Sequence, residues 1–342
     1  MPASTIAGLV LCALLTIAPP LAYVAGYPFW LDLFTRLVIL AIAATSLNLV
    51  LGYGGLVSFG HAAFLGLGAY AVGIPVHHAI NGEFDAIAST NGWLHIGLAI
   101  AVSALYALVT GAISLRTRGV HFIMITMAFG QMMFFAIVSI ETYGGDDGLT
   151  IYERSEFPLV DLNQPLQLYG AALASLFAAI FIVHRIVNSR FGMVLRGARG
   201  NEVRMRALGY NAYIFRLVAY VISGIMCGYA GALLGNFTTF ISPEMMDWTR
   251  SGELMFMVIL GGAGAIFGPV IGAAAFLLVE ELLQDGMKVI QSLLGLETDI
   301  SIYWHLPFGL LLIAAVLFLR GGISGVISDR GRSTSSKGAT DV

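Results

Sequence analysis

Charge is scarce in this sequence, where Asp, Glu, Lys and Arg make up 11% of 342 residues and hydrophobic residues 58%. So few charged side chains cannot cover the surface of a water-soluble globule. The chain therefore belongs in a lipid bilayer. Because lipid offers the backbone no hydrogen-bond partner, we expect the membrane-spanning segments to be helical.

Lysine is the scarcest charged residue, with Lys288 and Lys337 as its two examples, followed by Val289 and Gly338. A phosphate-binding loop needs Gly-Lys-Ser/Thr, so that the lysine and the hydroxyl reach phosphate and magnesium. The sequence excludes a nucleotide site of that form. Energy for any transport must come from another polypeptide or from an ion gradient.

The sequence also has no pattern of cysteines or histidines that would indicate a structural disulfide or a metal site. Cys12 and Cys227 lie in separate apolar spans, where a structural disulfide is not expected. His77, His78 and His95 match no standard zinc spacing. An intramembrane enzyme also lacks support, since neither a His-Glu-x-x-His motif nor a nucleophile and base pattern is present. We expect no enzymatic activity, no metal and no cofactor.

Long apolar runs are what the sequence does contain. Each run approaches the roughly 20 residues that cross a bilayer, and they predict eight to ten helical spans. The runs are 6–27, 33–51, 56–76, 94–114, 119–140, 167–184, 217–240, 252–280 and 303–319.

The few charges are sorted by loop. The regions 115–118, 185–216 and the tail from Arg320 hold thirteen basic and three acidic residues, whereas 77–95, 141–166, 241–253 and 280–301 hold sixteen acidic and three basic ones. Basic loops lie on the cytoplasmic side of membrane proteins. We therefore expect the first group and the C-terminus in the cytoplasm, and the second group outside.

This topology requires 252–280 to start and finish outside. Its centre, 260–269, is rich in glycine and contains a proline, so a continuous helix there would be costly. Two half-helices that dip in and return are predicted. A similar interruption at 48–61 in the first half indicates an internal repeat and a transport path between paired breaks. The predicted break residues are Gly52, Gly54, Gly55, Gly261, Gly262, Gly264 and Pro269.

The region 185–216 carries seven arginines and one acid, Glu202. Within it, Asn201 can cap the start of a short helix and Gly209 can end it in a left-handed turn. In most membrane proteins a basic loop only sets orientation. The two capped ends favour a docking element instead.

Polar residues beside the breaks are candidates for the transport path, because polar side chains at membrane depth face protein or a water-filled cavity. Hydrogen bonding between helices explains most of them equally well. No acid lies clearly inside a span except Glu253 and Glu280 near predicted ends, which gives a proton relay little support. The candidates are Thr45, Ser46, Asn48, Ser58 and His61, with Gln131, Asn236, Thr238 and Thr239 as weaker ones.

Several segments together resemble the LivM-type permease of branched-chain amino acid ABC importers over roughly residues 35–320. The segments are 46–70, 118–122 with 144–149, 191–209, 241–243 and 257–269. Arg199-Gly-Asn-Glu departs from the family pattern by carrying glycine where a longer side chain is common.

The resemblance implies half of a heterodimeric channel in the inner membrane. It implies as partners a LivH-type permease, two cytoplasmic ATPases and an extracytoplasmic binding protein, with no nucleic acid. It also leads to the hypothesis that 201–209 is a coupling helix seated on an ATPase, with Arg204 and Arg206 pairing with acids of that partner. The residues assigned to coupling are Arg196, Asn201, Glu202, Val203, Arg204, Arg206, Ala207, Leu208 and Gly209.

Residues 1–320 are therefore predicted to form the permease domain, beginning with a retained first helix, and 321–342 a disordered cytoplasmic tail. Other solutes remain open, namely urea, short amides and organic acids. An ion-coupled secondary transporter that works alone would also explain broken helices and a repeat. It would leave the capped basic loop without a purpose.

Overall fold

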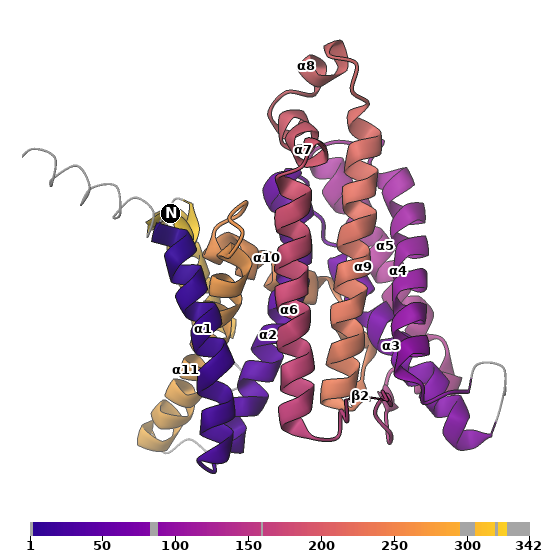
Figure 1. The fold of residues 1–342 in the computed structure, drawn as a ribbon, viewed down its shortest axis with the longest axis vertical. Helices are drawn as coiled ribbons and strands as arrows, with labels where there is room; N and C mark the ends of the chain where they lie inside the picture. The colour runs from indigo at the N-terminus through magenta and orange to yellow at the C-terminus, as the bar shows by residue number, and fades with distance from the viewer. Residues whose placement is uncertain (1–2, 83–87, 159, 295–304, 319–320, 327–342) are drawn as a thin grey trace, which may run out of the picture.

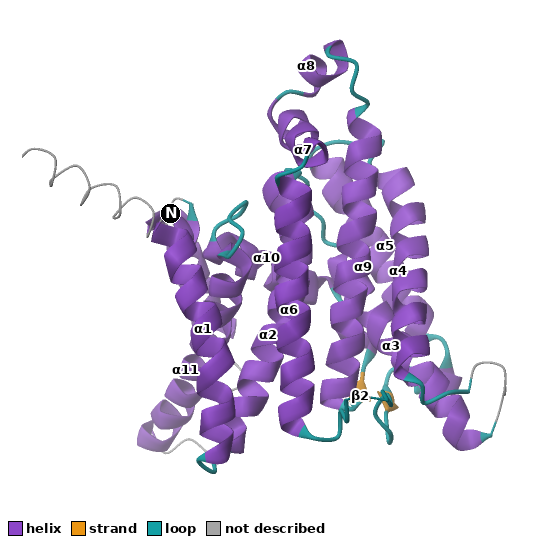
Figure 2. Ribbon diagram, in the orientation of Figure 1, coloured by secondary structure: helices purple, strands orange, loops and turns teal. Residues whose placement is uncertain are grey.

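The computed structural model describes residues 3–82, 88–158, 160–294, 305–318 and 321–326, and most of them are helical (Figure 2). This is the all-helical membrane fold that composition predicts. The elements before the basic loop are α1 (Ala3–Val24), α2 (Pro28–Asn48), the π-helix η1 (Leu49–Tyr53), α3 (His61–Asn81), α4 (Gly92–Ser114), α5 (Val120–Val138), η2 (Glu141–Tyr143), β1 (Leu149–Thr150) and α6 (Pro165–Val187). The remaining elements are α7 (Arg190–Gly200), α8 (Glu202–Ala207), α9 (Ala212–Thr238), β2 (Phe240–Ile241), η3 (Pro243–Met246), α10 (Trp248–Gly261), α11 (Gly268–Leu294) and α12 (His305–Phe318).

Seven of the described helices are long and apolar enough to cross a membrane. They are α1, α2 with η1, α3, α4, α5, α6 and α9, and they correspond in order to the first seven apolar runs of the sequence. The helices α10 and α11 lie beside them (Figure 1), and α12 contacts both α10 and α11. The chain is a polytopic membrane protein.

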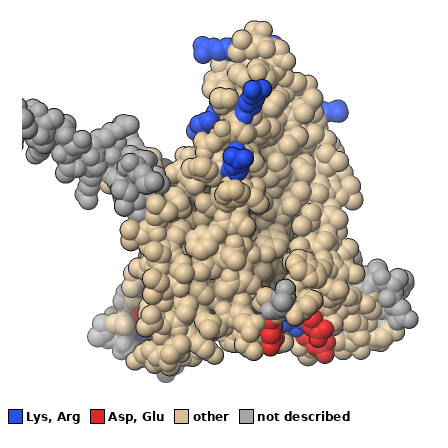
Figure 3. Space-filling view, viewed as in Figure 1, with Lys and Arg blue, Asp and Glu red and all other residues tan. Residues whose placement is uncertain are grey.

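The two ends of the bundle differ in charge. Figure 3 shows Lys and Arg gathered at the end that carries α7 and α8, and Asp and Glu at the opposite end. We call these the basic end and the acidic end. At the acidic end a short antiparallel sheet pairs Leu149 with Ile241 and Thr150 with Phe240.

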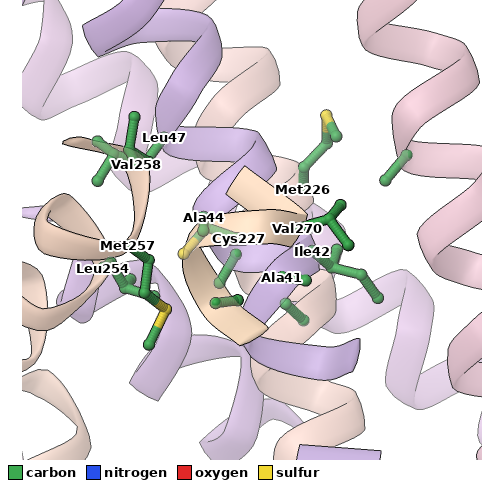
Figure 4. Close-up of a cluster of buried hydrophobic side chains, with 14 of the residues drawn as sticks. Ala41, Ile42, Ala44, Leu47, Met226, Cys227, Leu254, Met257, Val258 and Val270 are labelled. Carbon is green, nitrogen blue, oxygen red and sulfur yellow. The ribbon is translucent and has the colours of Figure 1, made fainter. Parts of the chain in front are cut away.

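The core forms where α2, α9, α10 and α11 meet, and Figure 4 shows small and branched apolar side chains packed there. Helix α9 also packs closely on α3 and α4 through its glycines. An added Cβ at Gly228 would lie 1.9 Å from the Ser103 hydroxyl, and one at Gly231 would lie 1.8 Å from the Leu65 carbonyl oxygen. These small residues therefore bring helices of the same chain together.

Two expectations about helix lengths need correction. The run 252–280 is broken into two helices at the predicted glycines, and α10 with 14 residues is a half-helix, but α11 has 27 residues and is longer than the half-helix expected. The predicted tail from 321 is not irregular at its start, since 322–326 is helical and Gly322 lies against the backbone of Gly262. The rest of that tail lies outside the described residues.

Candidate functional site

The short helix predicted in the basic loop is present as α8, and both predicted caps are formed. The Asn201 side chain accepts a hydrogen bond from the backbone N–H of Arg204 at 3.0 Å. At the other end Gly209 has φ +86°, in the left-handed region, and the N–H of Tyr210 donates to the Met205 carbonyl at 3.0 Å. This is a Schellman closure. The helix has only six residues, so these caps hold its ends in place.

The apolar residues Val203 and Ala207 of α8, and Leu208 directly after it, are open to the surroundings, whereas Met205 packs on α7. Val203 is 75% exposed and Leu208 is 65% exposed, and Ala207 is exposed as well. Figure 1 places α8 at the far tip of the basic end, beyond the ends of the spanning helices. The described part of the chain therefore leaves this apolar face uncovered at the outermost point of the loop.

Glu202 is the centre of the charges around α8. Its carboxylate forms ion pairs with Arg206 at 2.6 Å, Arg118 at 2.9 Å and Arg216 at 3.0 Å. Three elements are thereby joined, because Arg118 precedes α5 and Arg216 belongs to α9. Arg206 was expected to pair with acids of a partner, but its guanidinium already binds Glu202. Arg204, in contrast, is exposed and has no ion pair among the described residues.

Helix α7 contacts both the end of α6 and α8. The Ser189 hydroxyl caps α7 by accepting from the N–H of Gly192, and Arg196 donates from Nη2 to the Val187 carbonyl at 3.1 Å. Arg196 was assigned to ATPase coupling, and the structure gives it this contact with the last turn of α6. Met205 of α8 fills the space beside Gly197 of α7.

Arg199 connects the basic loop to the first helix break, and sequence analysis missed this residue. Its guanidinium Nη1 donates to the carbonyl of Gly52 in η1, and its side chain lies against Gly55. An added Cβ at Gly264, in the second break, would lie 3.9 Å from the same Nη1 atom. Nothing local distinguishes Arg199 from the other six arginines of 185–216, because its contacts are made by residues far away in the chain.

The two breaks predicted from glycine content touch each other at the basic end. The Asn48 amide Nδ2 donates to the Ala265 carbonyl at 2.9 Å, and its Oδ1 accepts from the N–H of Gly264 at 2.9 Å. An added Cβ at Gly52 would lie 2.4 Å from the Gly264 nitrogen. The buried side-chain amide of Asn48 therefore holds the two breaks together, and the missing side chain at Gly52 lets them approach closely.

The other break residues fit their positions. Gly55, Gly262 and Gly264 have φ of +68°, +114° and +85°, which side chains rarely adopt. Pro269 stands in the first turn of α11, where a missing N–H costs no hydrogen bond. Gly261 has no room for a Cβ beside the Gly268 carbonyl, and Gly54 ends η1.

The polar residues proposed for the path are all buried in helix packing: Thr45, Ser46, Asn48, Ser58 and His61. The His61 ring bonds to the Ser58 hydroxyl at 3.1 Å and to the Ser223 hydroxyl at 2.9 Å. The Ser223 hydroxyl in turn donates to the Ser46 carbonyl at 2.5 Å. The Ser46 hydroxyl bonds to the Ala43 carbonyl of its own helix, and the Thr45 hydroxyl has no partner among the described residues. The role of these residues in a path stays a prediction.

Among the weaker candidates, Asn236 accepts from the N–H of Ser155 at 2.8 Å, and Thr238 bonds to the Leu234 carbonyl at 2.9 Å. Thr239 bonds to the Thr238 carbonyl at 2.7 Å. Gln131 differs, because its Nε2 donates to the Asp247 carboxylate at 2.8 Å. It lies near the middle of α5, so Asp247 lies at the same depth.

The beginnings of α3 and α10 meet inside the bundle. The N–H of Ala62 donates to the Ser251 hydroxyl at 2.9 Å, and the rings of Phe59 and Trp248 have centroids 6.5 Å apart. Met246, just before α10, fills the space beside Gly66. At about 1.5 Å per residue, Gly66 is roughly 10 Å along α3 from Gly73, which packs on Ile241 of the acidic-end sheet. Helix α10 therefore starts deep within the bundle and rises only to the basic end.

Comparison with known proteins gives a consistent result. Residues 29–319 match the protein family described as "Branched-chain amino acid transport system / permease component". The high-affinity branched-chain amino acid transport system permease protein LivM of Salmonella typhimurium is 26% identical over 332 residues, covering 89% of this chain and 74% of that protein.

Two further relatives extend the comparison. A probable branched-chain amino acid transport permease protein LivM of Methanocaldococcus jannaschii is 25% identical, covering 82% of this chain and 89% of that protein. The nucleoside ABC transporter permease protein NupC of Lactococcus lactis is 22% identical, covering 61% of this chain and 72% of that protein. No solved structure matches this chain.

Proposed function

This chain belongs to the family of branched-chain amino acid transport permeases, and from that membership we propose that it forms half of the translocation path of an ABC importer for branched-chain amino acids. ATP is hydrolysed by separate subunits, because the sequence contains no Gly-Lys-Ser/Thr phosphate loop. The partners are a LivH-type permease, two ATPases and an extracytoplasmic binding protein.

In this proposal the basic end faces the cytoplasm and the acidic end faces outward. The excess of arginine around α7 and α8 supports that orientation. We therefore propose that α8, the C-terminus and the ATPases share the cytoplasmic side of the inner membrane.

The observation that carries the proposal is the uncovered apolar face of α8. Val203 and Leu208 are more exposed than most hydrophobic residues, yet the helix that bears them is fixed by caps at both ends and by Glu202. A partner protein can bind a rigid, projecting helix that exposes apolar side chains. We propose that an ATPase subunit covers it and that the exposed Arg204 pairs with an acid of that subunit.

A continuous set of contacts leads from this helix to the breaks. Helix α8 packs on α7 through Met205, α7 bonds to η1 through Arg199, and η1 touches the second break at Gly264. Movement of α8 by the ATPases would therefore displace both breaks together, with α3 and α11 following them. This route supports coupling between ATP hydrolysis and solute passage.

The test uses the complete complex reconstituted in liposomes. Arg204→Glu and Gly209→Pro should each lower leucine-stimulated ATP hydrolysis by roughly tenfold or more, the size of a lost interface anchor. Proline cannot adopt φ +86° and removes the N–H that donates to Arg206. Arg190→Glu is the matched control, because Arg190 is an exposed arginine of the same loop outside α8.

Three results would contradict the proposal. Coupling through α8 is wrong if Arg204→Glu and Arg190→Glu have equal effects on hydrolysis. The importer assignment is wrong if this chain alone accumulates solute from an ion gradient. The solute class is wrong if the complex accumulates urea, a short amide, an organic acid or a nucleoside in preference to leucine, isoleucine or valine.

A further inference from the structure

A cavity of about 1170 Å³ opens beside the deep end of α10. It is walled by α5, η3, α10, α11 and α12, and it lies apart from the contact between the two breaks. The coupling contacts do not involve it, and of the predicted path residues Gln131 reaches its wall by bonding to Asp247. Its lining combines two kinds of side chain that seldom occur together in a membrane, namely ionised groups and large aromatic rings.

Four charged residues line this cavity: Glu244, Asp247, Arg250 and Glu253. They lie inside the bundle, because Met246 packs on Gly66 and Asp247 bonds to Gln131 near the middle of α5. A charge at this depth costs several kcal/mol if lipid covers it. The cavity must therefore be filled by water, by protein or by a polar solute.

Two of these four charged groups, Asp247 and Glu253, already make hydrogen bonds within the protein. Asp247 caps α10 by accepting from the N–H and hydroxyl of Thr249 at 3.4 and 2.6 Å, and its other oxygen accepts from Gln131. Glu253 accepts from Nη1 of Arg250 at 2.8 Å. These contacts fix the position of the Arg250 guanidinium on the cavity wall.

The other two retain binding capacity. Arginine carries five N–H donors, and within the described part of the chain Arg250 uses only Nη1. Glu244 is exposed, and its carboxylate has no hydrogen bond or ion pair among the described residues. Both residues line the same cavity. One cationic and one anionic group are thus available in one cavity.

The remaining wall is aromatic and apolar. Phe59 and Trp248 lie side by side at the deep end, Phe276 and Phe308 pack edge to face with centroids 5.0 Å apart, and Phe256 also lines the space. Such a surface suits a branched aliphatic side chain. Ring faces also attract an ammonium group.

We propose that this cavity is a binding site for the solute during its passage, and that it accepts a zwitterion with an apolar side chain. The solute's ammonium group binds Glu244, its carboxylate binds the free N–H groups of Arg250, and its side chain lies on the aromatic wall. The inference deepens the proposed function and rests on it, because amino acids are the solutes of that importer.

Water access is the first test, made on the assembled complex. Cys12 and Cys227 are buried, so a single introduced cysteine gives a clean signal. Ile313→Cys on the α12 wall should react with a charged, membrane-impermeant thiosulfonate, and millimolar leucine should slow that reaction. Leu105→Cys is the matched control, because Leu105 is 64% exposed on a spanning helix outside the cavity. Absence of reaction at position 313 would mean that protein or lipid fills the cavity, which overturns the proposal.

The second test asks whether the site recognises each end of the solute. Binding is measured as the solute concentration that halves the rate at which the thiol introduced at position 313 reacts. With Glu244 and Arg250 unchanged, 4-methylpentanoate lacks the ammonium group and leucinamide lacks the carboxylate. Each should bind about tenfold or more weakly than leucine, the effect of losing one charge-assisted hydrogen bond. Equal protection by all three compounds would overturn the proposal even if every charge variant failed to assemble.

Charge variants assign the two roles. Glu244→Gln should abolish the preference for leucine over 4-methylpentanoate but keep the preference over leucinamide, and Arg250→Gln should do the reverse. A merely structural effect would weaken all three compounds alike and would overturn the assignment. Glu153→Gln, an exposed acid of the acidic-end loop, is the matched control.

Uptake by the unaltered complex separates the two proposals. If it accumulates leucine while the thiol introduced at position 313 shows no discrimination among the three compounds, the site is wrong and the importer stands. If it does not accumulate any branched-chain amino acid, the proposed function itself fails.

Discussion

The side chain of Asn48 is hydrogen-bonded to the backbone N–H of Gly264 at 2.9 Å, across more than two hundred residues of sequence. The same amide donates to Ala265, so Asn48 uses its donor and its acceptor on one turn of backbone. It is fully buried. The contact joins the end of α2 to the turn between α10 and α11.

Replacing Asn48 by Leu should destabilise the protein by about 1–3 kcal/mol, because two buried backbone groups of the second break lose their partner. The midpoint of thermal unfolding in detergent measures the change. Asn81→Leu is the control, since Asn81 is exposed at the end of α3 and bonds only to His77 among the described residues. Equal shifts for the two variants would show that the amide contributes nothing specific.

Gly52→Ala should separate the two breaks. The added Cβ would lie 2.4 Å from the Gly264 nitrogen and 2.0 Å from the Asn48 Oδ1 atom, and backbone cannot yield as a flexible side chain does. We expect a loss of about 1–3 kcal/mol in unfolding free energy together with reduced uptake by the complex.

Gly97→Ala provides the contrast, because nothing lies within 4 Å of an added Cβ in this helical position. Alanine there should be neutral or stabilise α4 by up to about 1 kcal/mol. If Gly52→Ala behaved like Gly97→Ala in both unfolding and uptake, the close contact of the breaks would be incorrect.

Part of this site could be predicted from local sequence signals, whereas the rest depends on contacts between residues far apart in the chain. Asn201 and Gly209 are capping residues whose action needs only their own neighbours, so the ends of α8 could be placed in advance. Glycine content likewise located both breaks. The hydrophobic runs gave the spans, because bilayer thickness and backbone satisfaction leave few alternatives.

Arg199 and the depth of α10 could not be read in this way. Arg199 has the same local surroundings as the other loop arginines, and its partner Gly52 lies in another helix. The segment before α10 looked like an outer loop because it is acidic, yet Met246 lies deep beside Gly66. Charge normally marks the membrane surface, and a cavity that hosts charges breaks that rule.

Arg199→Gln should uncouple ATP hydrolysis from transport. The amide is shorter than a guanidinium and cannot reach the Gly52 carbonyl from the same backbone position, so movement of α7 would no longer be passed to η1. We expect the number of solute molecules imported per ATP to fall by roughly tenfold, the effect of one charged hydrogen bond. ATP hydrolysis and leucine uptake are measured on the same proteoliposomes.

Arg185→Gln removes the same charge from the same loop and serves as the control, because Arg185 is exposed near the end of α6. A fall in uptake matched by an equal fall in hydrolysis would point to loss of folding or docking. Only a changed ratio of the two supports a transmitting role for Arg199.

The ion pair between Arg36 of α2 and Glu280 of α11 should respond differently to single and double substitution. The two groups are 3.1 Å apart, and the Glu280 side chain is only 9% exposed. Removing Arg36 leaves the Glu280 carboxylate buried without this partner, which costs up to about 3–5 kcal/mol, whereas replacing both residues with apolar ones of similar size is often neutral. Arg36 is itself 34% exposed, so it can turn to its surroundings when Glu280 is removed. Arg36→Met should therefore lower the unfolding midpoint strongly and Glu280→Leu less so, and the double variant should recover most of the loss caused by Arg36→Met. The exposed pair of Arg206 with Glu202 gives the comparison, because Arg206 is 61% exposed and surface pairs contribute at most about 1 kcal/mol. If the double variant unfolded at as low a midpoint as Arg36→Met, the charges would be serving a function beyond holding α2 against α11.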